Sequence, residues 1–235
     1  MQKLCAFVIL SSFLASGYVG AQESYSSTDT AGRETIRLPA SLEQLSAKQK
    51  KHIYEILQYP TLKTQAPAEK FVANKEMYQW LLDHPDKTSK AWQNLGVAAI
   101  NIQALNDGRF VWKDETGSEV VWYPIATSER GRIWYATGKV KPAKLIPTVP
   151  VTAVALLTHS DEKRPAGDAT ITHKVEVFMQ TDSKVASVVT RMMGDQIPTM
   201  AQTGCEQMLL FFSGIARYTH QKPEKIDGLF QTKKQ

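Results

Sequence analysis

The stretch MYQWLLDHPDKTSKAW, residues 77–92, decides how the middle of the chain folds. Apolar residues recur at helical spacing as far as Leu82. Pro85 disfavours helical geometry at the residue before it, so a first helix ends there. Asp86 or Thr88 can then cap a second short helix. The stretch therefore predicts two short helices that meet at a sharp corner.

The same stretch raises a question of chemistry, because Asp83, His84 and Asp86 lie within four positions. A metal site calls for histidines spaced i, i+4 on one helix face, or for a comparable cluster of ligands. His84 has no such partner. Each aspartate has a local backbone role, one near a helix end and one as a cap. We therefore interpret the cluster as a corner and expect neither metal nor catalysis from it.

Around this corner the pattern of apolar residues changes from helical to alternating. Six segments with strand character follow between Val97 and Asp182, joined by short turns such as Asn106-Asp107-Gly108. Alternation is clearest in one strand, where Ile171, His173, Val175, Val177 and Met179 share a face. The short connections predict an antiparallel meander.

Helical patterns stand at both ends of this strand region. Ser41 and Gln44 resemble a capping box at the start of a helix over 41–58. A short strand, EKFVA, follows it. A final helical region begins after Asp182 and is interrupted at Gly194 and Pro198. The predicted order is a helix, a strand, two short helices, six strands and a last helix.

This order, together with three segments of sequence, resembles the helix-grip fold of the START, birch-pollen-allergen and polyketide-cyclase superfamily, often called SRPBCC. The segments are Ala66-Pro67-Ala68-Glu69, the WLLDHPD run at 80–86, and Trp92. The resemblance covers about residues 60 to 220. It implies an α+β domain in which a curved antiparallel sheet of six to seven strands packs on a long C-terminal helix. The helix at 41–58 is an addition to that fold.

The first residues resemble an export signal. A short basic start is followed by an apolar run, and the small residues Val19 and Ala21 stand at the −3 and −1 positions of a cleavage site. An uncleaved anchor is the alternative. We expect a secreted or periplasmic protein, cleaved near Ala21. The predicted parts are a signal peptide (1–21), a flexible leader (22–40), a helix (41–58), a START-like domain (60–222) and a basic tail (223–235).

Composition narrows the function classes. The formal net charge is +5, with charges of both signs along most of the chain. The sequence therefore lacks the strong clustering of basic residues that is typical of nucleic-acid-binding proteins. Transient contact with an anionic membrane surface is compatible with this charge. Cys5 leaves with the signal, so Cys205 stands alone, and we expect a buried, inert thiol. The sequence contains no phosphate-binding loop, paired Cys-x-x-Cys or Gly-x-Ser-x-Gly motif, and we assign no cofactor, metal ligand or catalytic residue.

Three tryptophans, Trp112, Trp122 and Trp134, fall on three successive predicted strands. They line a pocket, with indole N–H groups that orient a ligand, or they fill an ordinary aromatic core. Methionine in the last helical region adapts to ligands but also fills core gaps. His173, on the inward face, is either a base or a core histidine satisfied by a neighbour. The candidate ligand-binding residues are Trp112, Trp122, Trp134, His173, Met192 and Met208.

We therefore predict an exported START-like domain that binds a lipid or another apolar small molecule between the sheet and the last helix. One alternative is a structural or interaction protein with a filled core. The other is a cyclase- or hydrolase-like enzyme with His173 or His159 as base. The sequence does not define the ligand or the oligomeric state.

Overall fold

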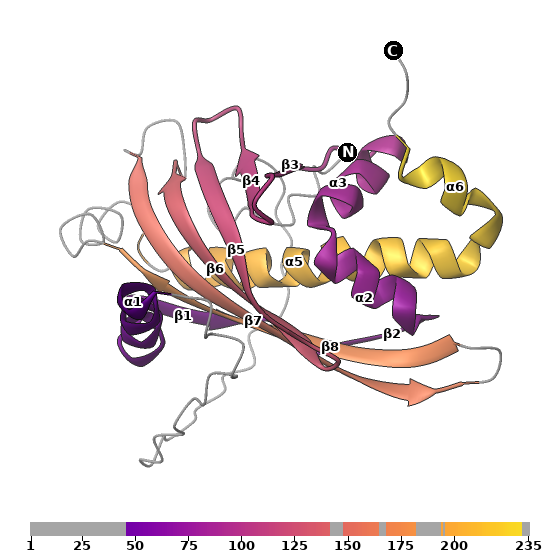
Figure 1. Cartoon of the computed structure of the whole chain (residues 1–235), viewed down its shortest axis with the longest axis horizontal. Helices are drawn as coiled ribbons and strands as arrows, with labels where there is room; N and C mark the ends of the chain where they lie inside the picture. Colours follow the sequence, from indigo (N-terminus) through magenta and orange to yellow (C-terminus); the bar gives the residue numbers. More distant parts are fainter. Residues whose placement is uncertain (1–45, 142–147, 165–167, 182–193, 195, 232–235) are drawn as a thin grey trace.

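A computed structural model describes residues 46–141, 148–164, 168–181, 194 and 196–231. Its centre is one curved antiparallel sheet with the strand order β1-β8-β7-β6-β5-β4-β3, in which β2 also pairs with β8 (Figure 1). The elements are α1 (Ala47–Gln58), β1 (Leu62–Gln65), β2 (Glu69–Asn74), α2 (Lys75–Asp83), α3 (Pro85–Asn94), β3 (Asn101–Ala104), β4 (Phe110–Lys113), β5 (Glu119–Ser128), β6 (Gly131–Val140), β7 (Val149–Lys163), β8 (Asp168–Gln180), α5 (Gln196–Gln221), η3 (Pro223–Lys225) and α6 (Ile226–Leu229).

The predicted fold class is confirmed, because the long helix α5 packs on the inner face of this sheet beside the pair α2–α3. Among the described residues the sheet has eight strands, one more than the upper prediction. The additional strand is β1, which pairs with β8 from Leu62 to Gln65, a stretch for which the sequence analysis predicted no strand. A turn then lets β2 pair with the other half of the same long strand.

The predicted corner forms between α2 and α3. The helix α2 ends at Asp83 and α3 begins at Pro85, whose missing N–H costs nothing in the first turn of a helix. Asp86 lies inside that first turn and is not the cap. Instead, the Thr88 hydroxyl donates to the carbonyl of His84, at 3.2 Å, and to that of Leu81. The corner is therefore held by the Thr88 side chain, which hydrogen-bonds two of its backbone carbonyls.

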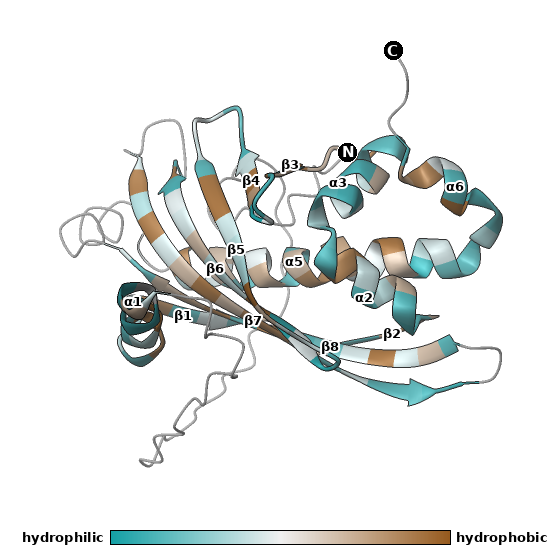
Figure 2. Cartoon of the chain, viewed as in Figure 1, coloured by the Kyte–Doolittle hydropathy of each residue, from teal (hydrophilic) through white to brown (hydrophobic). Residues whose placement is uncertain are grey.

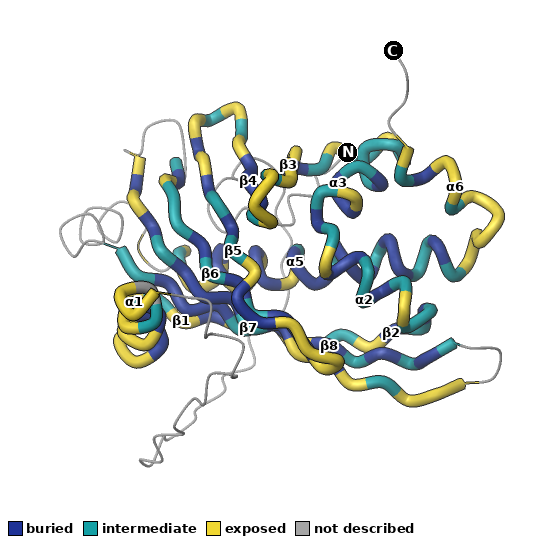
Figure 3. The backbone as a smooth tube through the Cα atoms, in the orientation of Figure 1, coloured by how far each residue is buried: buried dark blue, intermediate teal, exposed yellow. Residues whose placement is uncertain are grey.

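Two apolar clusters lie on opposite faces of the sheet. The larger one joins buried side chains of the inner face to those of the helices α2, α3 and α5. Figure 3 shows the buried residues running along α5 and the central strands. The smaller one joins Ile53, Ile56 and Leu57 of α1 to the outer face. The strand β8 keeps its predicted alternation, with its odd-numbered residues from Ile171 to Met179 buried on the inner face.

The last helix differs from its prediction at one point. Pro198 lies in the first turn of α5, where proline is tolerated, and so does not interrupt the helix. Cys205 is buried in α5, as predicted, and burial raises the pKa of its thiol to about 11. None of the described helices is both long and apolar enough to cross a membrane.

The start of the predicted tail folds back on the domain. Leu229 in α6 is buried, and the side-chain amide of Asn94 donates to the carbonyls of Leu229 and Gln231, at 2.8 and 2.9 Å. The predicted signal (1–21), leader (22–40) and the stretch 183–193 lie outside the described residues.

Candidate functional site

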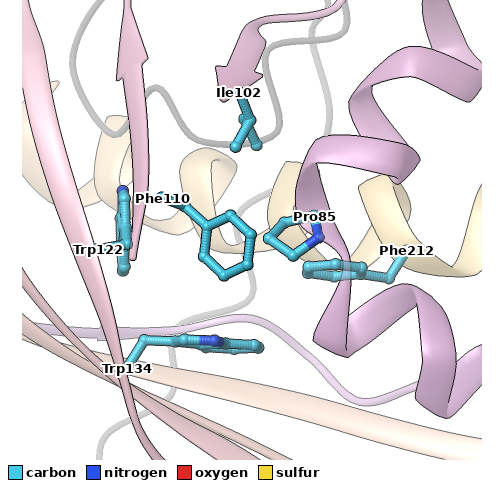
Figure 4. Close-up of a pocket in the computed structure, with 6 residues that line it drawn as sticks. All are labelled: Pro85, Ile102, Phe110, Trp122, Trp134 and Phe212. Carbon is cyan, nitrogen blue, oxygen red and sulfur yellow. The ribbon is translucent and has the colours of Figure 1, made fainter. Parts of the chain in front are cut away.

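An apolar pocket lies between the inner face of the sheet and the helices α3 and α5 (Figure 4). Six side chains line it, and each comes from a different element. They are Pro85 of α3, Ile102 of β3, Phe110 of β4, Trp122 of β5, Trp134 of β6 and Phe212 of α5.

The strand register explains how three of these side chains meet. Phe110 lies directly opposite Trp122, so both side chains project from the same face of the sheet. Trp134 reaches the same space from β6. Its indole ring stacks nearly parallel to the ring of Phe212, with centroids 6.1 Å apart and an interplanar angle of 7°. The stacked rings of Trp134 and Phe212 therefore connect the sheet to α5 across the pocket.

The pocket is small and carries no charge. Its volume is about 10 Å³, which is room for about one water molecule. None of the six lining side chains is titratable, so the pocket offers shape and apolar surface without an acid or a base. This composition suits the binding of an apolar group.

The six predicted site residues lie in different places. Trp122 and Trp134 line the pocket. Trp112 lies beside it, directly opposite Ile102 in the β3–β4 ladder, and is buried. Met208 is buried on α5, four residues before Phe212. Met192 lies outside the described residues.

His173 lies away from the pocket, in a buried network between β8 and α2. The Glu69 carboxylate can only accept, so the Nε2–H of His173 donates to it at 2.8 Å, and Nδ1 accepts from the hydroxyl of Tyr78 at 2.7 Å. Ser213 donates to the same carboxylate at 2.9 Å, and Arg217 forms an ion pair with it. Burial lowers the pKa of His173 to about 3. The network joins α2, β2, β8 and α5.

His159 lies directly opposite His173 in the β7–β8 ladder. Its ring meets that of Tyr78 edge-on, with centroids 5.3 Å apart. Both ring nitrogens are buried without a hydrogen-bond partner among the described residues. Burial, followed by the charge of Arg132, lowers the pKa of His159 to about 4. The imidazole is therefore neutral near pH 7.

The polar cluster at the corner has structural partners. Arg132, which is almost fully buried, donates to both carboxylate oxygens of Asp83, at 2.6 and 2.9 Å. The imidazole of His84 hydrogen-bonds the carbonyl of Trp80 through Nδ1 and stacks on its ring. Within the part of the chain that the structure describes, no group of three or more His, Cys, Asp or Glu side chains is arranged to hold a metal ion. Asp83 thus ties the corner to the β5–β6 hairpin.

Sequence reasoning did not select four of the six lining residues. Phe110 stands two residues before Trp112 on one strand, and Phe212 stands four residues after Met208 on one helix, so both share a face with a selected residue. Periodicity could therefore have found these two. Pro85 and Ile102 gave no such signal, because their positions depend on how α3 crosses the sheet edge.

No protein-family model and no curated protein matches this chain. Several solved structures are similar in shape at low identity. A conserved protein from Geobacillus kaustophilus is 12% identical over 68% of this chain and 97% of its own, with a TM-score of 0.47. Norcoclaurine synthase from Thalictrum flavum, in truncated form, is 12% identical over 65% of this chain and 96% of its own, with a TM-score of 0.32. Ara h 8.0201 is 13% identical over 60% of this chain and 97% of its own, with a TM-score of 0.30.

Proposed function

We propose that this protein binds a lipid or another apolar small molecule between the sheet and α5. The observation that carries the proposal is the convergence of six apolar side chains from six elements on one pocket. Apolar contact there would supply affinity at ~25 cal/mol per Å² of buried surface, before the costs of association. The lining offers no group for acid or base chemistry, which favours binding over catalysis.

The pocket must enlarge to hold such a molecule, and one wall is suited to move. Ile102 and Phe110 belong to β3 and β4, which are four residues each and form one end of the sheet. An edge strand is held by a ladder on one side only. Rotation of Phe110, or displacement of this short hairpin, would open the space between Trp122 and Phe212.

The test compares two substitutions that remove the same ring from opposite faces of the sheet. Phe110→Ala enlarges the pocket, whereas Phe178→Ala creates a cavity in the outer cluster against α1. The probe is aminoanthracene, a flat fluorescent apolar molecule. We expect stoichiometric binding to the wild type and about tenfold tighter binding to Phe110→Ala, because less side chain must be displaced. Equal affinities for the two variants would place the probe outside the pocket.

The small volume favours one alternative, a structural or interaction protein whose core is filled. In that case aminoanthracene does not bind the wild type, and Phe110→Ala only lowers the stability. The same titration therefore separates the two functions.

We propose further that the mature protein acts outside the cytoplasm, as a secreted or periplasmic protein with transient contact to membrane surfaces. The basic start, the apolar run and the small residues before position 22 support this. N-terminal sequencing of the protein from the exported fraction of its native host tests the proposal. A start at Gln22 is expected, and an intact Met1 would contradict it.

A further inference from the structure

A second hollow, which we call the α3–β3 groove, adjoins the apolar pocket. Its volume is about 200 Å³ and its lining is mainly polar. Most residues of α3, which forms one side of it, are hydrophilic (Figure 2). Ile102 lines both the pocket and the groove. The groove is lined by Asp86, Lys87, Ser89, Lys90, Gln93, Asn101, Ile102, Gln103, Ala104 and Phe230.

Ser89 bridges the two sides of the groove with two hydrogen bonds. The strand β3 is the last of the sheet, so its outer edge needs partners. Ser89 of α3 supplies them, because its hydroxyl accepts from the N–H of Ile102, at 3.3 Å, and donates to the carbonyl of Ile100. The side chain of Ile102, held by this bridge, therefore marks the boundary between the apolar pocket and the polar groove.

The groove carries an ammonium group, that of Lys90, which has no counterion among the described residues. Lys87 pairs with Asp86, at 3.7 Å, and these two charges offset each other. Lys90 forms no ion pair with any residue that the structure describes. It lies one helical turn from both residues, on the side of α3 that faces β3. Gln93 and Asn101, whose side chains carry amide N–H donors, also line the groove, and such donors suit an oxyanion.

A buried hydrogen-bond donor near Ile102 also favours a ligand that carries an oxygen atom. The indole of Trp112 is 2% exposed, and its Nε1–H has no hydrogen-bond partner among the described residues. A buried donor without an acceptor is costly. Trp112 lies directly opposite Ile102 in the ladder. A ligand that crosses the boundary at Ile102 with an oxygen atom could relieve this cost.

We infer that the ligand is an amphiphile with one carboxylate. Its apolar body occupies the aromatic pocket and its carboxylate lies in the α3–β3 groove, where the Lys90 ammonium pairs with it. Because the charges of Asp86 and Lys87 offset each other, the Lys90 ammonium leaves one net positive charge among the groove's lining residues, which matches a monoanion. The inference rests on the proposed binding function and adds the chemical class of the head group.

The test uses two probes that share an aromatic body, naphthoate and naphthalenemethanol. Their affinities are measured by fluorescence titration for the wild type, Lys90→Gln and the control Lys48→Gln, whose lysine is exposed on α1. We expect the wild type to prefer naphthoate about tenfold. Lys90→Gln should lose that preference and keep its affinity for the alcohol, whereas Lys48→Gln should retain both.

The outcomes separate the two proposals. Equal binding of both probes to the wild type, or an equal loss in both variants, would overturn the assignment of the groove and leave apolar binding intact. Failure of both probes to bind would overturn the apolar-binding function and the assignment of the groove with it.

Discussion

Replacing His159 by phenylalanine should reduce the loss of stability that the protein undergoes on acidification. The wild-type imidazole is 5% exposed, and burial together with the charge of Arg132 lowers its pKa from 6.5 to about 4. Between these two pKa values, His159 is therefore neutral in the folded state and protonated in the unfolded state. The full contribution of His159 to stability is present above pH 6.5 and is lost progressively as the pH falls towards 4.

The size of the effect follows from these two pKa values. Between about pH 7.5 and about pH 5, the wild type should lose about 2 kcal/mol of unfolding free energy through this one residue. His173 also has a lowered pKa, but it is present in both proteins and cancels in the comparison. His159→Phe should therefore lose about 2 kcal/mol less than the wild type over this range. Near pH 7.5 the variant should be at least as stable, because two buried nitrogens without partners are removed.

Urea unfolding, followed by tryptophan fluorescence at several pH values, measures the difference. The matched control is His52→Gln, which removes a partly exposed histidine on α1 and reports any general effect of losing this residue type. If His159→Phe loses stability as steeply as the wild type, the burial and charge assigned to His159 are wrong.

Two further substitutions test contacts that hold the helices α2 and α3 in place. Gly214→Ala would place a Cβ atom 2.5 Å from the Trp92 ring, so we expect a loss of about 1–3 kcal/mol in urea unfolding. A smaller side chain at Trp92 should restore part of that loss, and no loss at all would refute the close approach of α3 and α5. Asp83→Asn leaves the buried Arg132 guanidinium without its counterion and should cost about 2 kcal/mol by the same assay. An unchanged midpoint would mean that Arg132 finds another partner.

The sequence allowed prediction of those parts of the fold that depend on local patterns. Alternation in β8 predicted which of its residues are buried, and Pro85 predicted where α2 ends. The strand EKFVA was predicted and is β2, whereas β1 was not predictable, because it is only four residues long and forms by pairing with the distant β8. Local sequence patterns predict helices and single strands. The pairing of a strand with β8 depends on the tertiary structure.

The candidate site, too, could be predicted from the sequence only in part. The succession of strands brought Trp122 and Trp134 together, since neighbours in a meander are neighbours in space. The hydrogen-bond partners of His173 lie far away in the sequence, at Tyr78 and Glu69, and no spacing rule connects them. His173 was therefore selected for a pocket, although it belongs to a buried network between helices and sheet.

Native mass spectrometry of the protein, purified without detergent from its native host, tests apolar binding most directly. We expect the wild type to carry one small molecule per chain, which collisional activation releases and solvent extraction recovers as an apolar compound. Trp122→Arg places a charge in the pocket and should remove this mass. Val121→Arg places the same charge on the same strand, facing away from the pocket, and should retain it. Circular dichroism confirms that both variants are folded. A bare mass for the wild type, unchanged after incubation with aminoanthracene and fatty acids, would contradict ligand binding and indicate a filled core.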